Sequence, residues 1–216
     1  MAVARRRCTG ARAGVRRLYA TRDGDAVGQP GLELFLNLHE GALEPSPWVR
    51  RWSSLIRPQG RVLDVACGRG RHLRWLSARG FALTGVDRDA QALDGLRALG
   101  RMVAADIENG PWPFAAESFD AVVVTNYLWR PLLPTLVASV ADGGALIYET
   151  FALGNEAYGK PTNPDFLLRP GELLEACSGL HVVAYEEGLL DGPPRRVQRI
   201  AAQRRPPSPA PLELGS

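Results

Sequence analysis

A glycine turn between a short apolar run and an amphipathic helix constrains this chain more than any other feature. Residues 61–66 are mostly apolar and lead into Gly68 and Gly70, and the segment that follows places Leu73 and Leu76 on one helical face. A short apolar run bounded by glycines is typical of a buried strand, and leucines three positions apart are typical of a helix packed on one side. The segment therefore predicts one strand–turn–helix unit of an α/β fold.

The alternation of strand and helix continues along the chain. Apolar runs predict six further strands, at residues 81–86, 102–105, 120–125, 144–151, 181–186 and 196–202. Amphipathic segments predict helices at residues 46–56, 89–99, 131–140 and 169–177. Continuous apolar strands separated by helices indicate a parallel sheet that is covered on both faces. We expect a doubly wound, Rossmann-like, seven-stranded sheet that is mostly parallel and has an antiparallel final strand.

Composition indicates one folded domain with an extension at each end. The chain has 216 residues, of which 45% are hydrophobic and 23% are charged, and these are ordinary values for a globular domain. We expect a basic, poorly ordered N-terminal extension at residues 1–47, a folded domain at residues 48–203, and a Pro-rich disordered tail at residues 204–216. The three cysteines and three histidines are scattered, so no metal site is predicted.

The ends of the chain also bear on location. The first twenty residues are rich in arginine and lack the apolar segment of a secretory signal, and no apolar run is long enough to span a membrane. We therefore expect a cytoplasmic protein without a membrane partner. The basic ends are able to attract nucleic acid without sequence preference, but a solvated tail is the favoured interpretation.

Aspartates follow the second and third predicted strands. Asp87 comes 23 residues after Asp64, and Asp106 ends the third strand. An acid after the second strand of a nucleoside-binding unit accepts hydrogen bonds from ribose hydroxyls, and an acid after the third is able to accept one from an adenine amine. A nicotinamide site would have a third glycine where this chain has Leu73. Asp64 would repel a pyrophosphate but suits a cation such as S-adenosylmethionine, which carries an ammonium and a sulfonium.

Four motifs carry a family resemblance. VLDVACGRGRH, GVDRD, AADIE and FDAVVVTNYLW lie within residues 60–151, which resemble the core of class I S-adenosylmethionine-dependent methyltransferases. Ala66 departs from the family, because many members have glycine there. The segment at residues 149–173 is similar to small bacterial methyltransferases of the tellurite-resistance-like group, a second resemblance that covers about residues 48–203.

The resemblance implies a set of cofactor-binding residues. The glycine loop would hold the methionine part of S-adenosylmethionine, the acid after the second strand would hold the ribose, and the pair after the third strand would hold the adenine. In chain order these positions are Asp64, Ala66, Gly68, Gly70, Asp87, Asp106 and Ile107, and Asn126 after the fourth strand is expected to line the same site.

The acceptor is expected at the end of the fourth strand. This segment lacks the Asn/Asp-Pro-Pro-aromatic motif of methyltransferases that act on exocyclic amino groups of DNA bases. Asn126, Tyr127 and Trp129 are candidates for the pocket lining, with core packing as the alternative for Trp129. Arg130 either pairs with an anionic acceptor or is solvated, and His72 is expected to pack or cap.

A long irregular loop at residues 152–168 is expected to cover the acceptor, because such connections often serve as active-site lids. Its candidate residues are Tyr158, Lys160, Asn163 and Arg169, with a simple surface loop as the alternative. No catalytic residue is assigned, because the need for a base depends on the acceptor: a soft thiolate or an anionic chalcogen needs little help from a base, whereas a hydroxyl needs a base near its proton.

These observations together predict a methyltransferase that moves a methyl group from S-adenosylmethionine to a small-molecule nucleophile without a metal. Three alternatives stay open. The first is an RNA or protein methyltransferase recruited by the basic tails, the second is a non-catalytic module that binds the nucleoside cofactor, and the third is a nicotinamide oxidoreductase.

Overall fold

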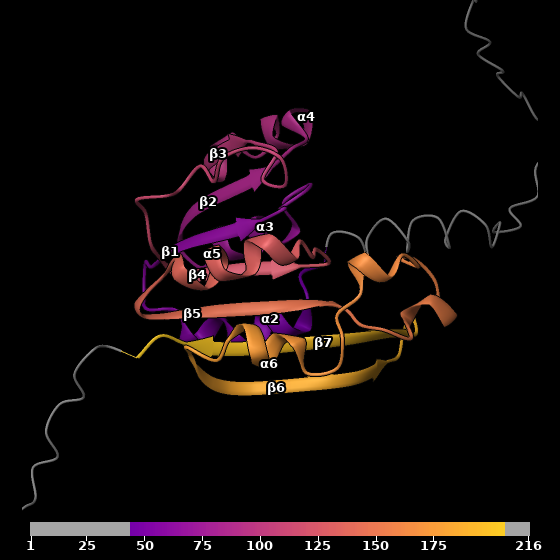
Figure 1. Cartoon of the computed structure of the whole chain (residues 1–216). Helices are drawn as coiled ribbons and strands as arrows, with labels where there is room; N and C mark the ends of the chain where they lie inside the picture. Colours follow the sequence, from indigo (N-terminus) through magenta and orange to yellow (C-terminus); the bar gives the residue numbers. More distant parts are fainter. Residues whose placement is uncertain (1–43, 206–216) are drawn as a thin grey trace, which may run out of the picture.

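The computed structural model describes residues 44–205; most of the predicted N-terminal extension and of the Pro-rich tail lies outside this range. Seven strands form one sheet in the order β3-β2-β1-β4-β5-β7-β6 (Figure 1). The strands are β1 (Arg61–Val65), β2 (Ala82–Asp87), β3 (Gly100–Ala104), β4 (Phe119–Thr125), β5 (Val140–Phe151), β6 (His181–Leu190) and β7 (Arg195–Gln203). The first five strands pair in parallel, and β7 is antiparallel to both β5 and β6. The predicted fold class is confirmed.

Helices cover both faces of the sheet. They are α2 (Pro47–Trp52), α3 (Arg71–Ser77), α4 (Ala90–Asp94), α5 (Leu133–Ala138) and α6 (Glu172–Ala176), with the 3-10 turns η1 (Ser53–Leu55), η2 (Arg97–Leu99), η3 (Arg130–Leu132), η4 (Asn155–Ala157) and η5 (Pro164–Phe166). Successive side chains of a strand point to opposite faces. Val122 and Val124 of β4 therefore join the core under α5 and α6, and Ala121 and Val123 join the core under α2 and α3.

Several helices are shorter than the sequence predicts, and glycine and proline account for this. The segment predicted at residues 89–99 divides into α4 and η2 around Gly95, because glycine costs about 1 kcal/mol in a helix interior relative to alanine. Pro134 stands in the first turn of α5, which follows a separate 3-10 turn. Gly171 has φ +72° and is the N-cap of α6, so that helix begins after Pro170 rather than at residue 169.

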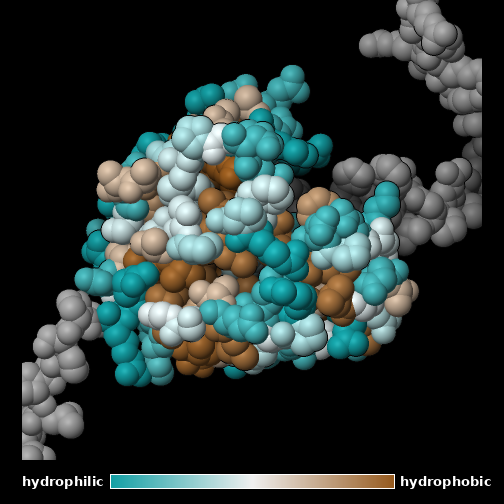
Figure 2. Space-filling view, viewed as in Figure 1, coloured by the Kyte–Doolittle hydropathy of each residue, from teal (hydrophilic) through white to brown (hydrophobic). Residues whose placement is uncertain are grey.

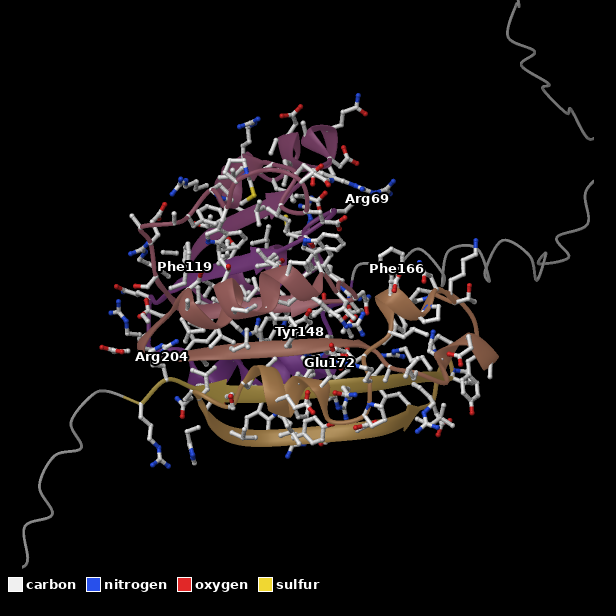
Figure 3. The ribbon with its side chains drawn as sticks, viewed as in Figure 1. Arg69, Phe119, Tyr148, Phe166, Glu172 and Arg204 are labelled. Carbon is white, nitrogen blue, oxygen red and sulfur yellow. The ribbon has the colours of Figure 1, made fainter. Side chains whose placement is uncertain are left out.

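The sheet order places the end of β1 beside the end of β4. The strand order runs outward from β1 on one side to β2 and β3 and on the other side to β4 and β5, so β1 and β4 flank the point of reversal. In sheets of this kind ligands bind at the carboxyl ends of the strands next to that point. Arg69 and Phe166 both lie at this edge of the molecule (Figure 3).

The surface differs between the two ends of the sheet. Figure 2 shows hydrophobic side chains reaching the surface over α5 and α6, whereas the region of α4 is mainly hydrophilic. Within residues 44–205, no helix is both long and apolar enough to cross a membrane.

Candidate functional site

Three adjoining cavities lie at the carboxyl ends of the parallel strands. The β2–β3 cavity measures about 230 Å³ and is lined by Ala66, Asp87, Arg88, Ala105, Asp106, Ile107, Glu108, Tyr127 and Phe166. The glycine-loop cavity measures about 220 Å³ and is lined by Ala66, Cys67, Gly68, Arg69, Arg71, His72, Thr125 and Asn126. The β4–β5 cavity also measures about 220 Å³ and is lined by Glu108, Asn126, Tyr127, Leu128, Thr150, Phe151, Pro161 and Phe166.

Shared walls join the cavities into one site. Ala66 lines both the β2–β3 cavity and the glycine-loop cavity, and Asn126 lines both the glycine-loop cavity and the β4–β5 cavity. Glu108, Tyr127 and Phe166 line the β2–β3 and β4–β5 cavities. Each cavity alone is smaller than a usual small-molecule site, whose volume is at least about 300 Å³, but the three cavities together exceed that volume.

The end of β2 is built around the carboxylate of Asp87. Its Oδ2 accepts a hydrogen bond from the backbone N–H of Gly68 at 2.8 Å, and its Oδ1 accepts one from the N–H of Asp89 at 2.9 Å. Each carboxylate oxygen has a further lone pair, so Asp87 is still able to accept from a ligand hydroxyl. Asp87 therefore holds the glycine loop in place as well as lining the β2–β3 cavity. Asp89 caps α4 through its side chain.

The end of β3 is ordered in a similar way by Asp106. Its Oδ1 accepts the backbone N–H groups of Glu108 and Asn109, and its Oδ2 accepts the side-chain amide of Asn109 at 3.0 Å. The hydrogen bonds from Asn109, with that from Glu108, hold the pKa of the Asp106 carboxyl below its ordinary value. The carboxylate thus stays ionised and fixes the turn that brings Ile107 and Glu108 to the cavity wall.

The glycine loop adopts left-handed backbone conformations at three positions. Ala66, Gly68 and Gly70 have φ values of +51°, +52° and +74°. A Cβ at Gly68 would meet no atom within 4 Å, so this position leaves open space beside the glycine-loop cavity. A Cβ at Gly70 would come within 2.6 Å of the Leu96 side chain. Gly68 therefore keeps the cavity open, whereas Gly70 allows the loop to pack on the core.

Asp64 lies beneath the loop and does not line the cavities. Its side chain is 1% exposed, and its Oδ2 is buried without a hydrogen-bond partner among the described residues. Burial raises the pKa of Asp64 to about 8, although the guanidinium of Arg71 opposes this shift. A buried carboxyl that lacks a partner is suited to a cation, which would favour its ionised form.

His72 connects this carboxyl to the cavity wall. Its Nε2 accepts the backbone N–H of Ser46 at 3.1 Å, so Nδ1 carries the proton in the neutral ring and lies 4.0 Å from Asp64 Oδ2. Burial lowers the pKa of His72 to about 3, with a further contribution from Arg71. The ring therefore stays neutral at physiological pH and packs between elements, in line with the sequence prediction.

The residues present fit S-adenosylmethionine. Its ammonium suits the unpartnered Asp64, its ribose hydroxyls suit Asp87, and its carboxylate suits Arg71, whose guanidinium also donates to Thr125 Oγ1 at 3.3 Å. Sequence reasoning missed Arg71, although an arginine directly after the second glycine of the loop is a visible signal. Cys67 also lines this cavity, but burial raises the pKa of its thiol, which therefore stays protonated.

The predicted acceptor residues divide into two groups. Asn126 and Tyr127 line the β4–β5 cavity, and the Tyr127 hydroxyl is buried without a hydrogen-bond partner in the described part of the chain. The remaining candidates do not line any of the three cavities. Trp129 packs against the hydrophobic core, Tyr158 and Lys160 lie on the exposed part of the loop, Asn163 caps η5, and Arg169 lies beside Glu172.

The 152–168 loop nevertheless reaches the site through other residues. Pro161 and Phe166 line the β4–β5 cavity, and Phe166 also lines the β2–β3 cavity. Asn155, which is 1% exposed, organises the base of the loop by accepting the N–H of Arg196 and donating to the carbonyl of Pro161. Sequence reasoning missed Phe166 and Glu108, because an aromatic residue in a loop and an acid after a strand carry no distinctive spacing.

Arg130 ties the end of β4 to the loop. Its guanidinium donates to both carboxylate oxygens of Glu172, at 2.7 and 3.0 Å (Glu172 in Figure 3). It also donates to the backbone carbonyls of Asp165 and Leu167, at 2.8 and 2.7 Å. Both predicted roles for Arg130, a partner of an anionic acceptor and a solvated side chain, are therefore wrong. Its four bonds hold the loop segment that carries Phe166.

Comparisons with known proteins identify sequences that this chain resembles. Residues 62–143 match a family described as "Methyltransferase domain". A curated relative, the thiopurine S-methyltransferase of Pseudomonas fluorescens, is 28% identical over 165 residues, which cover 75% of this chain and 72% of the relative.

Solved structures show the same fold. TehB from Haemophilus influenzae has a TM-score of 0.59 and 21% identity, covering 73% of this chain and 61% of that one. A TehB-like S-adenosylmethionine-dependent methyltransferase from Corynebacterium glutamicum also has a TM-score of 0.59, with 18% identity over 81% of this chain and 96% of that one.

Proposed function

We propose that this chain, a class I S-adenosylmethionine-dependent methyltransferase, transfers the methyl group to a small-molecule nucleophile held in the β4–β5 cavity. The observation that carries the proposal is the sharing of Asn126 between the glycine-loop cavity and the β4–β5 cavity. A donor seated along the β2–β3 and glycine-loop cavities would present its methyl group near this residue, with the acceptor on the other side.

The roles of the chain follow from this arrangement. Asp87 binds the ribose, Asp106 with Ile107 frames the adenine, and Asp64 with Arg71 meets the two charged ends of the methionine part. When bound, S-adenosylmethionine supplies an activated methyl group for an in-line displacement by the acceptor. Enzymes that use such a donor mainly position the acceptor and exclude water, which are the roles of Tyr127 and Phe166 here.

The dimensions and lining of the β4–β5 cavity favour a small acceptor. The cavity measures about 220 Å³, and its lining has no lysine, arginine or histidine. A track for a nucleic-acid strand would need basic side chains for the phosphates. Thiols are the first class to test, because the curated relative is named a thiopurine S-methyltransferase and a thiolate needs little assistance from a base.

The test follows a labelled methyl group from S-adenosylmethionine into three fractions: a panel of small aromatic thiols, total RNA and a protein extract. We expect label in the small-molecule fraction. Label only in RNA or protein would refute the proposal in favour of a macromolecular substrate, and cofactor binding without label in any fraction would favour a non-catalytic module.

A matched pair of variants ties the activity to the site. Asp87→Asn is expected to weaken binding of S-adenosylmethionine by ~1–3 kcal/mol, because it replaces a charged acceptor of hydrogen bonds. Asp89→Asn is the control, since Asp89 lies two residues away and caps α4, a position at which asparagine serves equally well. Equal affinity of the two variants in calorimetry would contradict the placement of the ribose.

A further inference from the structure

The β4–β5 cavity has a charge of its own. Glu108, which follows Ile107 at the end of β3, is the only carboxylate among its lining residues, and these include no lysine, arginine or histidine. No ion pair joins Glu108 to another residue within 44–205, and its only hydrogen bond there is made by its backbone N–H to Asp106. The carboxylate is therefore not committed to holding the fold.

The negative charge of Glu108 reaches into the cavity. The pKa of the Tyr127 hydroxyl is raised, first by burial and then by the charge of Glu108, although this hydroxyl has no hydrogen-bond partner among the described residues. Both side chains line the same two cavities. An ionised carboxylate at the wall of a partly enclosed cavity acts through a lower dielectric than water and so influences any charge bound there.

No basic side chain lines the β4–β5 cavity, so no cation neutralises this charge from within it. Arg88 lines the β2–β3 cavity but not the β4–β5 cavity, and the guanidinium of Arg130 is committed to Glu172 and two carbonyls. Lys160 precedes the lining residue Pro161 but is itself exposed and absent from the lining.

The remaining walls of the β4–β5 cavity are uncharged and mostly apolar. Tyr127, Phe151 and Phe166 contribute aromatic rings, and Thr150 and Asn126 contribute polar groups without charge. Flat aromatic walls favour planar ligands, and a negative charge at one side favours a ligand with a hydrogen-bond donor or a positive charge at that position.

We infer that Glu108 is a specificity-determining residue that selects planar acceptors with a neutral or cationic group at its side of the cavity and rejects acceptors that place an anionic group there. This inference rests on the proposed function for the identity of the cavity as the acceptor site. It excludes oxyanions and carboxylated aromatic molecules as good acceptors, because such ligands would place like charges together in a cavity without a basic side chain.

Three aromatic thiols of similar shape provide the probe, and they differ in the charge of the ring substituent opposite the sulfur: benzenethiol has no substituent, 4-(aminomethyl)benzenethiol carries a cationic one, and 4-mercaptobenzoate carries an anionic one. Their binding is measured by calorimetry on the full chain saturated with S-adenosylhomocysteine, which prevents turnover. We expect the neutral and cationic thiols to bind at least tenfold more tightly than the anionic one. Glu108→Gln should reduce this ratio of affinities to about threefold or less, and Glu108→Lys should invert it. Glu175→Lys, which makes the same charge change at an exposed position of α6, should leave the ratio unchanged.

The ratio of affinities within one variant separates selection from a structural role, since a general loss of folding or of cofactor binding weakens all three ligands alike. Equal binding of the anionic and neutral thiols by the wild type, an unchanged ratio in Glu108→Lys, or failure of all three to bind would overturn the inference. Turnover is measured in parallel with S-adenosylmethionine. Binding in the expected order without methylation of any thiol would count against thiols as acceptors in the proposed function while leaving the charge selection standing.

Discussion

The two glycines of the loop look alike in the sequence, but the structure predicts that replacing Gly70 by alanine mainly lowers stability, whereas replacing Gly68 mainly weakens cofactor binding. Both have positive φ, so each alanine carries left-handed strain of about 1–2 kcal/mol. At Gly70 the new Cβ would also come within 2.6 Å of the Leu96 side chain. Overpacking of this kind lowers the free energy of unfolding by a further ~1–3 kcal/mol. At Gly68 the new Cβ meets no protein atom within 4 Å.

The assay compares unfolding with cofactor binding in the same pair of variants. Gly70→Ala is expected to melt several degrees below Gly68→Ala, because 1 kcal/mol corresponds to about 2–4 °C in a domain of this size. Gly68→Ala is expected to weaken S-adenosylmethionine by about tenfold in calorimetry, since its Cβ occupies space beside the glycine-loop cavity. The folded fraction of Gly70→Ala should retain most of its affinity.

A double-mutant cycle tests the assigned cause. Leu96→Ala removes the atoms that a Cβ at Gly70 would meet, so the two substitutions should couple by about 1–3 kcal/mol, with the double variant more stable than the sum of the single effects predicts. Additive losses would refute the contact with Leu96 as the reason for Gly70. Equal melting of the two glycine variants would refute the distinction between them altogether.

Three further predictions concern buried or strained groups. Ala66→Gly should stabilise the protein by ~0.5–1 kcal/mol in urea unfolding, because glycine relieves the strain of φ +51° but adds entropy to the unfolded chain; a loss of stability would contradict this. The pKa of Asp64 is raised to about 8, so between pH 6.5 and 8 this carboxyl binds a proton in the folded state that it does not bind in the unfolded state. The free energy of unfolding of the cofactor-free protein should therefore fall with rising pH, by about 2 kcal/mol over that window. Below pH 6.5 the lowered pKa of His72 makes stability rise with pH, so urea unfolding is compared only above pH 6.5. Asp64→Asn should abolish the decline in stability, and Asp142→Asn, at an exposed position, should retain it. Arg130→Met should cost ~2–3 kcal/mol, since it removes the guanidinium that binds both oxygens of the buried Glu172 carboxylate and leaves only Arg169 beside it, and adding Glu172→Gln should recover part of that loss; no recovery would mean that the bonds to the loop carbonyls dominate.

Much of the fold could be predicted because the strands carry strong local signals. Four of the seven residues of β4 are valine or alanine, and the strand is buried on both faces, so its type follows from its composition. The positions of Asp87 and Asp106 at the cavity also follow, because the carboxyl ends of parallel strands meet at one edge. Helix lengths were less predictable, since Gly95 and Pro134 divide segments whose apolar pattern continues across them.

The acceptor side of the site could not be predicted in the same way. Arg130 was weighed as a ligand for an anion, but its partners Glu172, Asp165 and Leu167 come from a loop and a helix more than thirty residues away. Phe166 lines two cavities, and Arg130 binds the carbonyls of the residues on either side of it. Contacts that depend on how a long connection folds back leave no periodic trace in the sequence.

The contact between Ser46 and His72 has a consequence for where the folded unit can be trimmed. Ser46 is 4% exposed, its N–H binds His72, and its hydroxyl both accepts from Trp48 and donates to Glu149, which lies at the far end of β5. A protein shortened to begin at residue 48 would preserve all seven strands and all the cofactor-facing acids. It would also remove the amide that holds the tautomer of His72 and the hydroxyl that binds Glu149, and so weaken the structure beneath the donor site although no strand is lost.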